Sequence, residues 1–209
     1  MKNKTKTLLI YSGGMDSTTL LYWLLNRGDD VSALSFVYGQ RHVREVDAAR
    51  SICTKLGVGH KVSILPHIAG SSLTGQSKIP HGHYEEESMK STVVPNRNMI
   101  MIAHATSVAI AGGFNNVAYA AHSGDHAIYP DCRDEFLQVM RKAIKLCDWA
   151  EIELVAPFVH LDKIDIASIG DRLGVPFDMT WTCYEGGDVP CGKCGACVER
   201  SEALETIGK

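Results

Sequence analysis

The sequence predicts an α/β protein in which helices cover both faces of one parallel β-sheet. Short apolar runs that suit buried strands alternate with stretches of helical periodicity along most of the 209 residues, and this alternation is typical of a parallel sheet. Polar turns follow the first two apolar runs, where sheets of this class bind ligands. Because 45% of the residues are hydrophobic, we expect one full domain over residues 1–180 and a small segment packed on it over 181–209.

The first strand, turn and helix predict a phosphate site. Residues 8–11 are apolar and suit a short buried strand, a Ser-Gly-Gly turn follows at 12–14, and a helical pattern begins at Asp16. The glycines permit positive φ and a close approach, so backbone N–H groups and the helix amino terminus can face an anion. The alternative is an ordinary turn capped by Ser12, Asp16 or Ser17. The flanking strand and helix favour the phosphate site.

The next elements continue the alternation of strand and helix. Leucines at helical spacing predict a helix over residues 17–26 that stops at Gly28. The pattern then predicts a strand at 31–38, a helix at 45–56 and a strand at 61–65.

Residues 66–94 show no regular periodicity. This length is unusual for a connection within a compact domain and indicates a functional excursion or a mobile segment. His81 and His83 could ligate a metal, although solvated loop histidines are far more common. We expect the three glutamates at 85–87 to form a solvated face.

Regular structure returns in the second half of the chain. The sequence predicts a buried helix at 99–111, a strand at 116–121, a helix that is capped by Asp134 and runs to about Trp149, a strand at 152–156 and a helix from 161–163 to Gly174. A polar loop at 122–133 would lie at the carboxyl end of the fourth strand.

Composition favours a small-molecule substrate. The net charge of −3 offers no basic field for a nucleic-acid backbone. No segment approaches the roughly 18 apolar residues that would span a bilayer, and only a strand-length apolar run follows the basic first six residues. An odd number of cysteines, seven, argues against a disulfide framework. We therefore expect a cytoplasmic protein.

Four cysteines near the carboxyl end predict a metal site. Cys191, Cys194 and Cys197 have C-x-x-C-x-x-C spacing and Cys183 precedes them, so a tight turn can direct the sulfurs at one tetrahedral Zn²⁺ ion. An iron–sulfur cluster or a redox-active C-x-x-C pair are the alternatives. A site with four protein ligands would be structural.

The other three cysteines have no ligand spacing. We expect Cys53 and Cys147 to pack within helices, and Cys132 to be unpaired.

Five motifs resemble those of the 7-cyano-7-deazaguanine synthase family, a branch of the PP-loop ATP pyrophosphatases, in order and over almost the whole chain. They are Ser-Gly-Gly-Met-Asp-Ser at 12–17, Phe-x-Tyr-Gly-Gln-Arg-His at 36–42, Val-Pro-Asn-Arg-Asn at 94–98, Tyr-Pro-Asp-Cys-Arg at 129–133, and the cysteine cluster. Two departures stand out. Asn96 replaces a glycine common in the family but tolerates positive φ, and seven residues separate Cys183 from Cys191 where one more is also familiar.

The resemblance implies an adenine nucleotide alpha hydrolase-like (PP-loop) fold and an ATP-dependent ligase. The family converts 7-carboxy-7-deazaguanine and ammonia to 7-cyano-7-deazaguanine (preQ0) for queuosine biosynthesis. It adenylates the carboxylate and then the amide, and each round releases AMP and pyrophosphate. ATP, Mg²⁺ and structural Zn²⁺ are the implied cofactors, and a homodimer without nucleic-acid or membrane partners is the implied assembly.

The resemblance also implies site residues. Lys163 would contact the phosphates, although it could instead be a surface lysine, and Asp16 would orient the turn or assist the metal. The expected nucleotide-binding residues are Tyr11, Ser12, Gly13, Gly14, Met15, Asp16, Ser17, Thr18, Thr19, Leu34, Tyr38 and Gln40.

The residues that would bind the base are less sharply defined. Asp125 or Asp131 could accept from its amino and ring N–H groups, and Arg97 or Arg133 could clamp its carboxylate. Asn98 is a weaker candidate, as are Arg41 and His42, and each could instead brace its loop.

Three other functions are compatible with parts of the pattern. A member of the same family could stop at the amide. A PP-loop enzyme that thiolates tRNA would need a basic surface and reactive cysteines, and a zinc-ribbon binding module would need a Lys/Arg-rich face. The net negative charge and the use of the C-x-x-C thiols as metal ligands disfavour the thiolating enzyme. The absence of a Lys/Arg-rich face and the presence of the nucleotide-binding motif disfavour the binding module.

Overall fold

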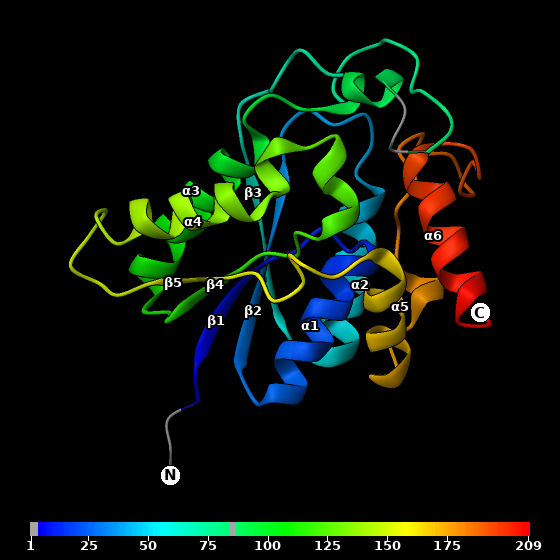
Figure 1. Cartoon of the computed structure of the whole chain (residues 1–209). Helices are drawn as coiled ribbons and strands as arrows, with labels where there is room; N and C mark the ends of the chain where they lie inside the picture. The colour runs from blue at the N-terminus through cyan, green and yellow to red at the C-terminus, as the bar shows by residue number, and fades with distance from the viewer. Residues whose placement is uncertain (1–3, 84–86) are drawn as a thin grey trace.

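The computed structural model describes residues 4–83 and 87–209 and contains a five-stranded sheet in the order β3-β2-β1-β4-β5. Each neighbouring pair is parallel, as the sequence predicts. The strands are β1 (Lys6–Ile10), β2 (Asp30–Val37), β3 (Gly59–Ile64), β4 (Asn116–Ala118) and β5 (Glu153–Val155). Figure 1 shows the sheet between two layers of helices.

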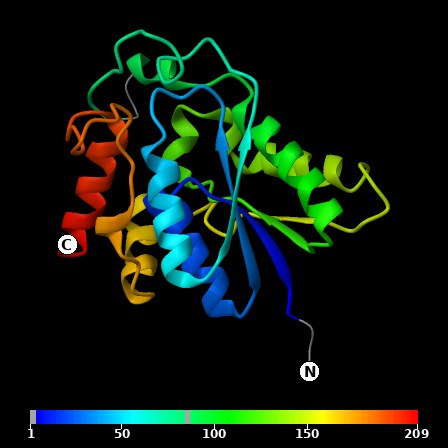
Figure 2. The same cartoon turned by 180° about the vertical axis from the view of Figure 1, so that it is seen from behind.

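Helices cover both faces of the sheet, and the views from front and back agree on this (Figures 1 and 2). One layer holds α1 (Met15–Arg27), α2 (Arg44–Leu56) and α5 (Lys163–Arg172), and the other holds α3 (Arg97–Gly112) and α4 (Asp134–Ile144). Successive β1 residues serve opposite cores, because side chains alternate along a strand. Leu8 packs with the α3 and α4 residues, whereas Leu9 packs with those of α1, α2 and α5.

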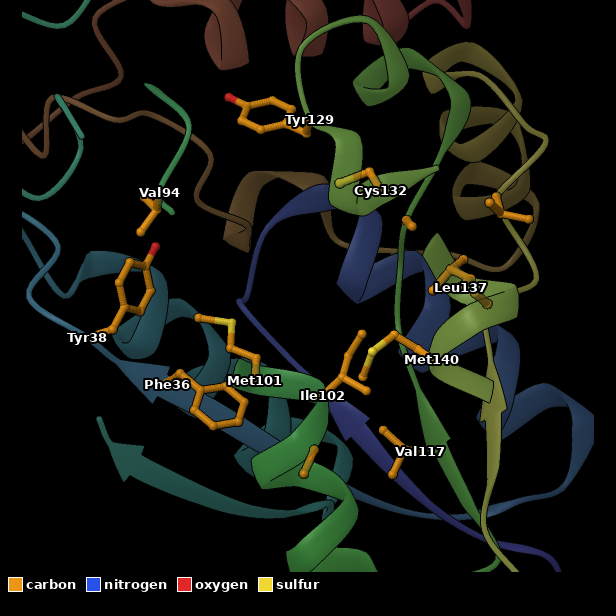
Figure 3. Packing of buried hydrophobic residues seen from close by; sticks show 14 of the residues in the cluster. Phe36, Tyr38, Val94, Met101, Ile102, Val117, Tyr129, Cys132, Leu137 and Met140 are labelled. Carbon is orange, nitrogen blue, oxygen red and sulfur yellow. The ribbon is translucent and has the colours of Figure 1, made fainter. Parts of the chain in front are cut away.

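The larger core lies on the α3 and α4 side and reaches the carboxyl ends of the strands (Figure 3). Ile102 and Leu137 are fully buried in it. Its members Tyr38, Tyr129 and Cys132 also line the cavity described below, so the packing of this core positions part of the site.

The turn after β1 depends on a glycine. Gly13 has φ +84°, and a Cβ atom there would overlap the carbonyl oxygen of Glu45 and the backbone of Ala49 in α2. Only glycine meets both conditions. The capping residues considered above are not used, because Gly14 is the N-cap and no side chain caps the helix.

The described residues of the 66–94 segment, 66–83 and 87–94, contribute buried side chains to the protein. Leu73 and Met89 are buried, and a short 3₁₀ helix, η1, spans Glu87–Thr92. His81 forms an antiparallel bridge with Cys194, so the segment contacts the cysteine cluster. His81 and His83 are mostly exposed and lie near glutamates. Glu87 is exposed, as expected, and Glu85 and Glu86 lie outside the described residues.

Several predicted boundaries in the second half need correction. β4 ends at Ala118, short of the predicted 121, and α4 ends at Ile144, short of Trp149. Trp149 is fully exposed, so no packing holds a longer helix together there. The N-cap of α4 is Arg133, and Asp134 is the first helical residue, where its charge still complements the helix dipole.

The predictions for two of the remaining cysteines have different outcomes. Cys53 is buried within α2, as predicted. The prediction for Cys147 was wrong, because it is exposed beyond the end of α4.

A last helix, α6 (Gly195–Thr206), lies outside α5 and was not predicted from the sequence. Its Ala203 packs in a small core with Met15 of α1 and Ala167 of α5. The carboxyl-terminal segment is therefore joined to the sheet domain by apolar contacts. Among the described helices, none has the length and apolar character needed to cross a membrane.

Candidate active site and metal centre

A cavity of about 240 Å³ opens at the carboxyl ends of β1, β2 and β4. The loops that surround it come from both halves of the sheet, from α2 and α3, and from the carboxyl-terminal segment. Its lining includes polar side chains near α1 and aromatic ones near α3. This is where sheets of this topology bind ligands.

The Ser-Gly-Gly turn forms one wall of the cavity. Ser12, Gly14, Met15, Asp16 and Ser17 line it. The hydroxyls of Ser12 and Ser17 lie 3.0 Å apart, and the Gly14 amide donates to Ser12 Oγ at 3.1 Å. Hydroxyls and amides gathered at a helix amino terminus suit an anion.

The remaining residues that were predicted to bind the nucleotide differ in whether they line the cavity. Tyr11, Tyr38 and Gln40 also line the cavity. Three others lie outside the lining and are buried behind it; they are Thr18, Thr19 and Leu34. Thr18 contacts the Tyr11 hydroxyl at 3.1 Å, so it supports the wall. Gly13 also lies outside the lining, and its carbonyl accepts from the Trp181 amide.

Asp16 and Lys163 meet across the cavity, although 147 positions separate them. Lys163 Nζ donates to Asp16 Oδ2 at 2.7 Å and lies 3.4 Å from Glu199 Oε2. The capping box of Asp162 and Asp165 fixes the start of α5, where Lys163 sits. Lys163 is therefore not a surface lysine, because its side chain is 11% exposed.

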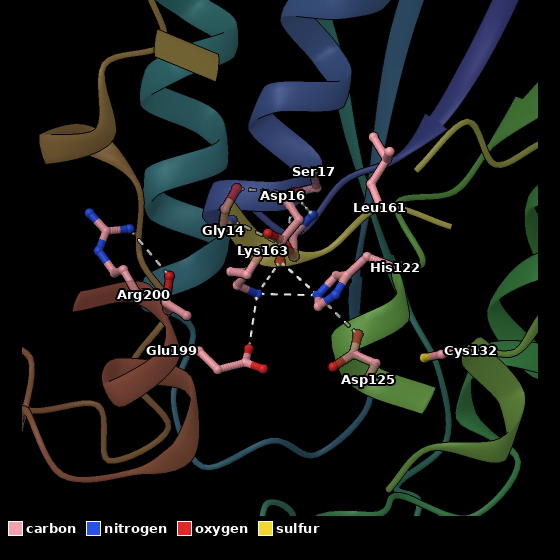
Figure 4. Close-up of polar contacts among 12 residues, drawn as sticks. Gly14, Asp16, Ser17, His122, Asp125, Cys132, Leu161, Lys163, Glu199 and Arg200 are labelled. Atoms are coloured by element: carbon pink, nitrogen blue, oxygen red, sulfur yellow. Dashed lines mark hydrogen bonds and ion pairs between the residues drawn. The ribbon is translucent and has the colours of Figure 1, made fainter. Parts of the chain in front are cut away.

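His122 completes the charged cluster, and neither it nor Glu199 was among the predicted site residues (Figure 4). Its Nε2 lies 3.2 Å from Lys163 Nζ and 3.3 Å from Asp125 Oδ2. A polar residue directly after a parallel strand was the available signal for His122. Glu199 lies on the unpredicted helix α6, so the sequence offered no comparable signal.

The contact between Asp16 and Lys163 shifts the pKa values of these two groups in opposite directions. Burial raises the pKa of Asp16, but Lys163 and His122 outweigh burial and hold that pKa well below its usual range. Burial lowers the pKa of Lys163, but the carboxylates of Asp16 and Glu199 raise it overall. Both groups are therefore charged across the physiological range.

The acidic members of the cluster fit a divalent cation. Asp16 Oδ1 is buried and has no hydrogen-bond partner in the described part of the chain. An unpaired carboxylate oxygen is the kind of ligand that Mg²⁺ takes. Asp16 could thus contribute one oxygen to such an ion.

The opposite end of the cavity holds Arg97 and aromatic side chains. Arg97 donates to the Tyr38 hydroxyl at 3.3 Å and lies over its ring. Asn98 and Asp125 also line the cavity.

Asp131 and Arg133, which were the predicted alternatives to Asp125 and Arg97, do not line the cavity. Asp131 lies outside the lining and accepts from the Asn98 amide at 3.3 Å. Arg133 is exposed and donates to the His126 carbonyl. Of each predicted pair, Asp125 and Arg97 are the members with access to the cavity.

Glu45 is a further cavity residue that was not predicted. It lies in the first turn of α2 and lines the cavity. Burial raises its pKa to about 7, and only the charge of Arg97 acts in the other direction. A carboxyl group with this pKa at a cavity wall can bind N–H donors of a ligand.

The four predicted cysteines converge on one point. The sulfurs of Cys183, Cys191, Cys194 and Cys197 all lie within 4.8 Å of one another. Tetrahedral coordination with Zn–S bonds of about 2.3 Å places sulfurs about 3.8 Å apart. The Cys191 and Cys197 sulfurs are already 4.0 Å apart, and backbone amides, including that of Cys194, point at Cys191 Sγ. The set fits a single ion such as Zn²⁺.

Comparison with known proteins shows the family. The family model described as "Queuosine biosynthesis protein QueC" matches residues 6–208. A 7-cyano-7-deazaguanine synthase of Methanoregula boonei is 52% identical over 97% of this chain and 95% of its own length. Enzymes of the same name from Pseudoalteromonas atlantica and Caldicellulosiruptor saccharolyticus are 51% and 49% identical, and the matches cover 94% and 92% of their lengths.

Proposed function

Because the chain belongs to the QueC family, we propose that it converts 7-carboxy-7-deazaguanine and ammonia to 7-cyano-7-deazaguanine at the expense of ATP. The name shared by relatives at about 50% identity over nearly the whole chain supports this most strongly. The cavity adds physical support, since it combines an anion-binding turn with an aromatic end. The enzyme is then a ligase that forms C–N bonds.

The conversion requires two adenylation steps, first of the carboxylate and then of the amide. A carboxylate oxygen attacks the α-phosphorus of ATP, and the bond to pyrophosphate breaks. Ammonia attacks the acyl carbon, AMP leaves with the C–O bonding electrons, and loss of one proton gives the amide. The amide oxygen then attacks a second ATP, and departure of AMP with loss of the N–H protons gives the nitrile. Both carboxylate oxygens end in AMP.

The residues of the turn and of α5 would stabilise the charges that develop. Ser12, Gly14 and Ser17 would donate to the leaving pyrophosphate. The Lys163 ammonium would face the α-phosphate, where negative charge grows in the transition state. Asp16 holds that ammonium in place, and its free oxygen would ligate Mg²⁺, which neutralises phosphate charge when bound.

The base would occupy the aromatic end of the cavity. Arg97 would bind its carboxylate, and Asp125 is placed to accept from an N–H group. The four cysteines would hold Zn²⁺ in a closed structural site. Thiolates of this kind persist in a reducing compartment such as the cytoplasm.

A homodimer is also expected from the family resemblance. Leu146 and Trp149 are 88% and 101% exposed beyond α4, so these are the apolar side chains that such an interface would cover. Sedimentation of the protein and of Leu146→Ser and Trp149→Ser variants tests this assembly.

Turnover with defined substrates tests the function. The protein is incubated with ATP, Mg²⁺, ammonium and 7-carboxy-7-deazaguanine carrying ¹⁸O in its carboxylate, without RNA. We expect AMP and pyrophosphate, one ¹⁸O atom in each AMP, and a product with the mass of the nitrile. An amide product would limit the reaction to one round. Formation of ADP, or AMP without label, would contradict the proposal. Asp16→Ala and Lys163→Ala should both strongly slow label transfer.

A further inference from the structure

Among the described residues, Glu45 is the carboxylate of the cavity that has no partner. Three carboxylates of the described chain line the cavity, those of Asp16, Glu45 and Asp125. Asp16 accepts from Lys163, and Asp125 Oδ2 lies 3.3 Å from His122 Nε2. The carboxylate of Glu45 makes no hydrogen bond and no ion pair within residues 4–83 and 87–209. A strong acceptor is therefore left open toward the cavity.

Arg97 presents the opposite charge to the same cavity. It donates to the Tyr38 hydroxyl, and no carboxylate of the described chain lies within ion-pair distance of its guanidinium. Glu45 is near enough for the charge of Arg97 to oppose the effect of burial on the Glu45 pKa, but the two side chains do not pair. Opposite charges that face one cavity without pairing suit a ligand with N–H donors at one end and an anion at the other.

The base of the proposed substrate has both of these groups. Its six-membered ring presents N1–H and a 2-amino N–H side by side, and its 7-carboxylate projects from the five-membered ring. The two oxygens of a carboxylate can accept from two parallel N–H donors, as they do from a guanidinium. Adenine presents an amino donor beside a ring acceptor instead, so ATP would offer an ionised carboxylate only one hydrogen bond.

We propose that Glu45 is the specificity-determining residue for the base, and that it accepts hydrogen bonds from N1–H and the 2-amino group while Arg97 binds the 7-carboxylate. This assignment rests on the proposed function. Tyr38 and Trp181 line the same cavity, and aromatic faces of this kind stack on planar bases. Asp125 would then accept from the N–H group of the five-membered ring.

The packing of α2 fixes Glu45 relative to the phosphate end of the cavity. Glu45 lies in the first turn of α2, and a Cβ atom on Gly13 would lie 2.4 Å from its carbonyl oxygen. The backbone of α2 is thus packed directly against the Ser-Gly-Gly turn. A residue that binds the base and a turn that binds pyrophosphate are then held at a fixed separation, as attack of the carboxylate oxygen on the α-phosphorus requires.

An analogue of the base tests the assignment, with AMP formation measured at saturating ATP. In 7-carboxy-7-deazahypoxanthine a hydrogen replaces the 2-amino group, so one donor to Glu45 is lost. We expect kcat/KM of the wild type to be roughly tenfold to a hundredfold lower with the analogue, because a hydrogen bond to a charged acceptor is missing. In Glu45→Gln the amide nitrogen faces a donor of the natural base in either orientation. Its preference for the natural base should therefore shrink to about threefold or less.

A matched control and two further measurements separate recognition of the base from other effects. Glu135→Gln is the control, because Glu135 also lies in the first turn of a helix, α4, but is exposed and outside the cavity lining. It should keep the wild-type preference. KM for ATP should stay within about twofold of wild type in Glu45→Gln. Calorimetry without turnover should give the same preferences as ratios of dissociation constants for the two bases.

The ratio between the two bases decides the proposal. A Glu45→Gln variant with the wild-type preference, whatever its overall activity, would overturn it, because a structural role of Glu45 would affect both bases alike. A wild type that uses the two bases equally, or a loss in Glu45→Gln confined to KM for ATP, would also overturn it. Absence of AMP formation by the wild type would instead contradict the proposed function, and the calorimetric ratios would still decide the role of Glu45.

Discussion

Lys163 is the cation on which the acidic side chains of the cavity converge, so its removal affects both catalysis and stability. Lys163→Met keeps most of the stem but removes the ammonium. We expect the rate of AMP formation to fall about 10²- to 10³-fold, because one donor to developing phosphate charge is lost. We expect the free energy of unfolding to fall by about 3 kcal/mol, because Asp16 is left without its partner.

Comparison of single and double variants separates these two effects. Asp16→Asn combined with Lys163→Met should regain part of the stability in urea unfolding, but none of the activity. Lys61→Met is the matched control, because Lys61 is an exposed lysine on β3. A double variant as active as the wild type would contradict the role given to Lys163.

Glu45 should make the ligand-free protein less stable as pH rises. Its pKa is about 7 in the folded protein, raised by burial from an ordinary 4.5. Between these values the folded state holds more protons than the unfolded state, so stability falls as pH increases through this window. Glu45→Gln cannot ionise. We therefore expect it to exceed the wild type in stability at pH 8, by at most about 3 kcal/mol, and less to the extent that solvent screens the side chain.

Urea unfolding at pH 4.5 and pH 8 measures this difference. The gain at pH 8 should disappear at pH 4.5, where the wild-type carboxyl is protonated in the folded state. Glu151→Gln, at an exposed glutamate before β5, controls for the change in net charge. Equal gains at both pH values would show that packing, and not ionisation of Glu45, sets the effect.

At the scale of single residues, the sequence predicted those side chains of the candidate site that lie in or next to a recognisable motif. Asp16 lies in the first helical turn directly after the glycine turn, and Lys163 opens a helix after a strand. Glu45 and Glu199 belong to none of the motifs themselves, and only the fold brings Glu45 to the cavity and Glu199 to Lys163. His122 had a usable signal in its place after β4, since parallel strands place ligand residues there.

Among the elements, the turn after β1 depends most strongly on one residue. Gly13→Ala places a methyl group against the backbone of α2, so either the turn or the helix must move. Gly28→Ala is the matched control, because Gly28 also has positive φ but has open space around it. We expect the control to cost about 1–2 kcal/mol from backbone strain alone, and Gly13→Ala to cost more.

Calorimetry with ATP completes that comparison. Only Gly13→Ala should weaken nucleotide binding, because only this change displaces the wall that includes Ser12 and Gly14. Equal stability of the two variants would indicate that the backbone of α2 can shift away from a methyl group at position 13 at little cost in free energy. Unchanged affinity for ATP would show that the turn does not bind the phosphates.

The pattern of apolar residues predicted the helices and strands that bury one or both faces. It did not predict where a helix ends when the packing against the rest of the protein stops. The first strand and its helix follow apolar runs that bury on both sides, and their positions agree with prediction. The helix after Arg133 stops at Ile144 because nothing covers Trp149. Asn96 has φ 57°, as its replacement of a family glycine suggested. Helix α6 escaped prediction because the residues it buries, apart from Cys197, are Gly195, Ala196 and Ala203, which show little apolar periodicity, and because the metal ligands at its start dominate the pattern.

In the whole molecule, the carboxyl-terminal segment lines the candidate active site and also carries the four cysteines that could hold a metal. Trp181 and Thr182 line the cavity, and the Trp181 amide donates to the Gly13 carbonyl at 3.1 Å. Glu199 lies in the same segment and contacts Lys163. The predicted boundary at residue 180 thus marks a change of composition. It does not separate two independent sites, and the sequence could not show this because the contacts span most of the chain.

Removal of the metal should therefore make the Ser-Gly-Gly turn at residues 12–14 more mobile. Cys191→Ser, or treatment with a chelator, removes the tie between Cys183 and α6, so Trp181 and Glu199 lose their fixed positions. We expect loss of about one Zn²⁺ per chain, faster hydrogen exchange at the Trp181 amide, and weaker ATP binding. Cys147→Ser is the matched control, because Cys147 is exposed and outside the cluster. Normal ATP affinity and exchange in the metal-free protein would show that the segment folds onto the turn without its metal.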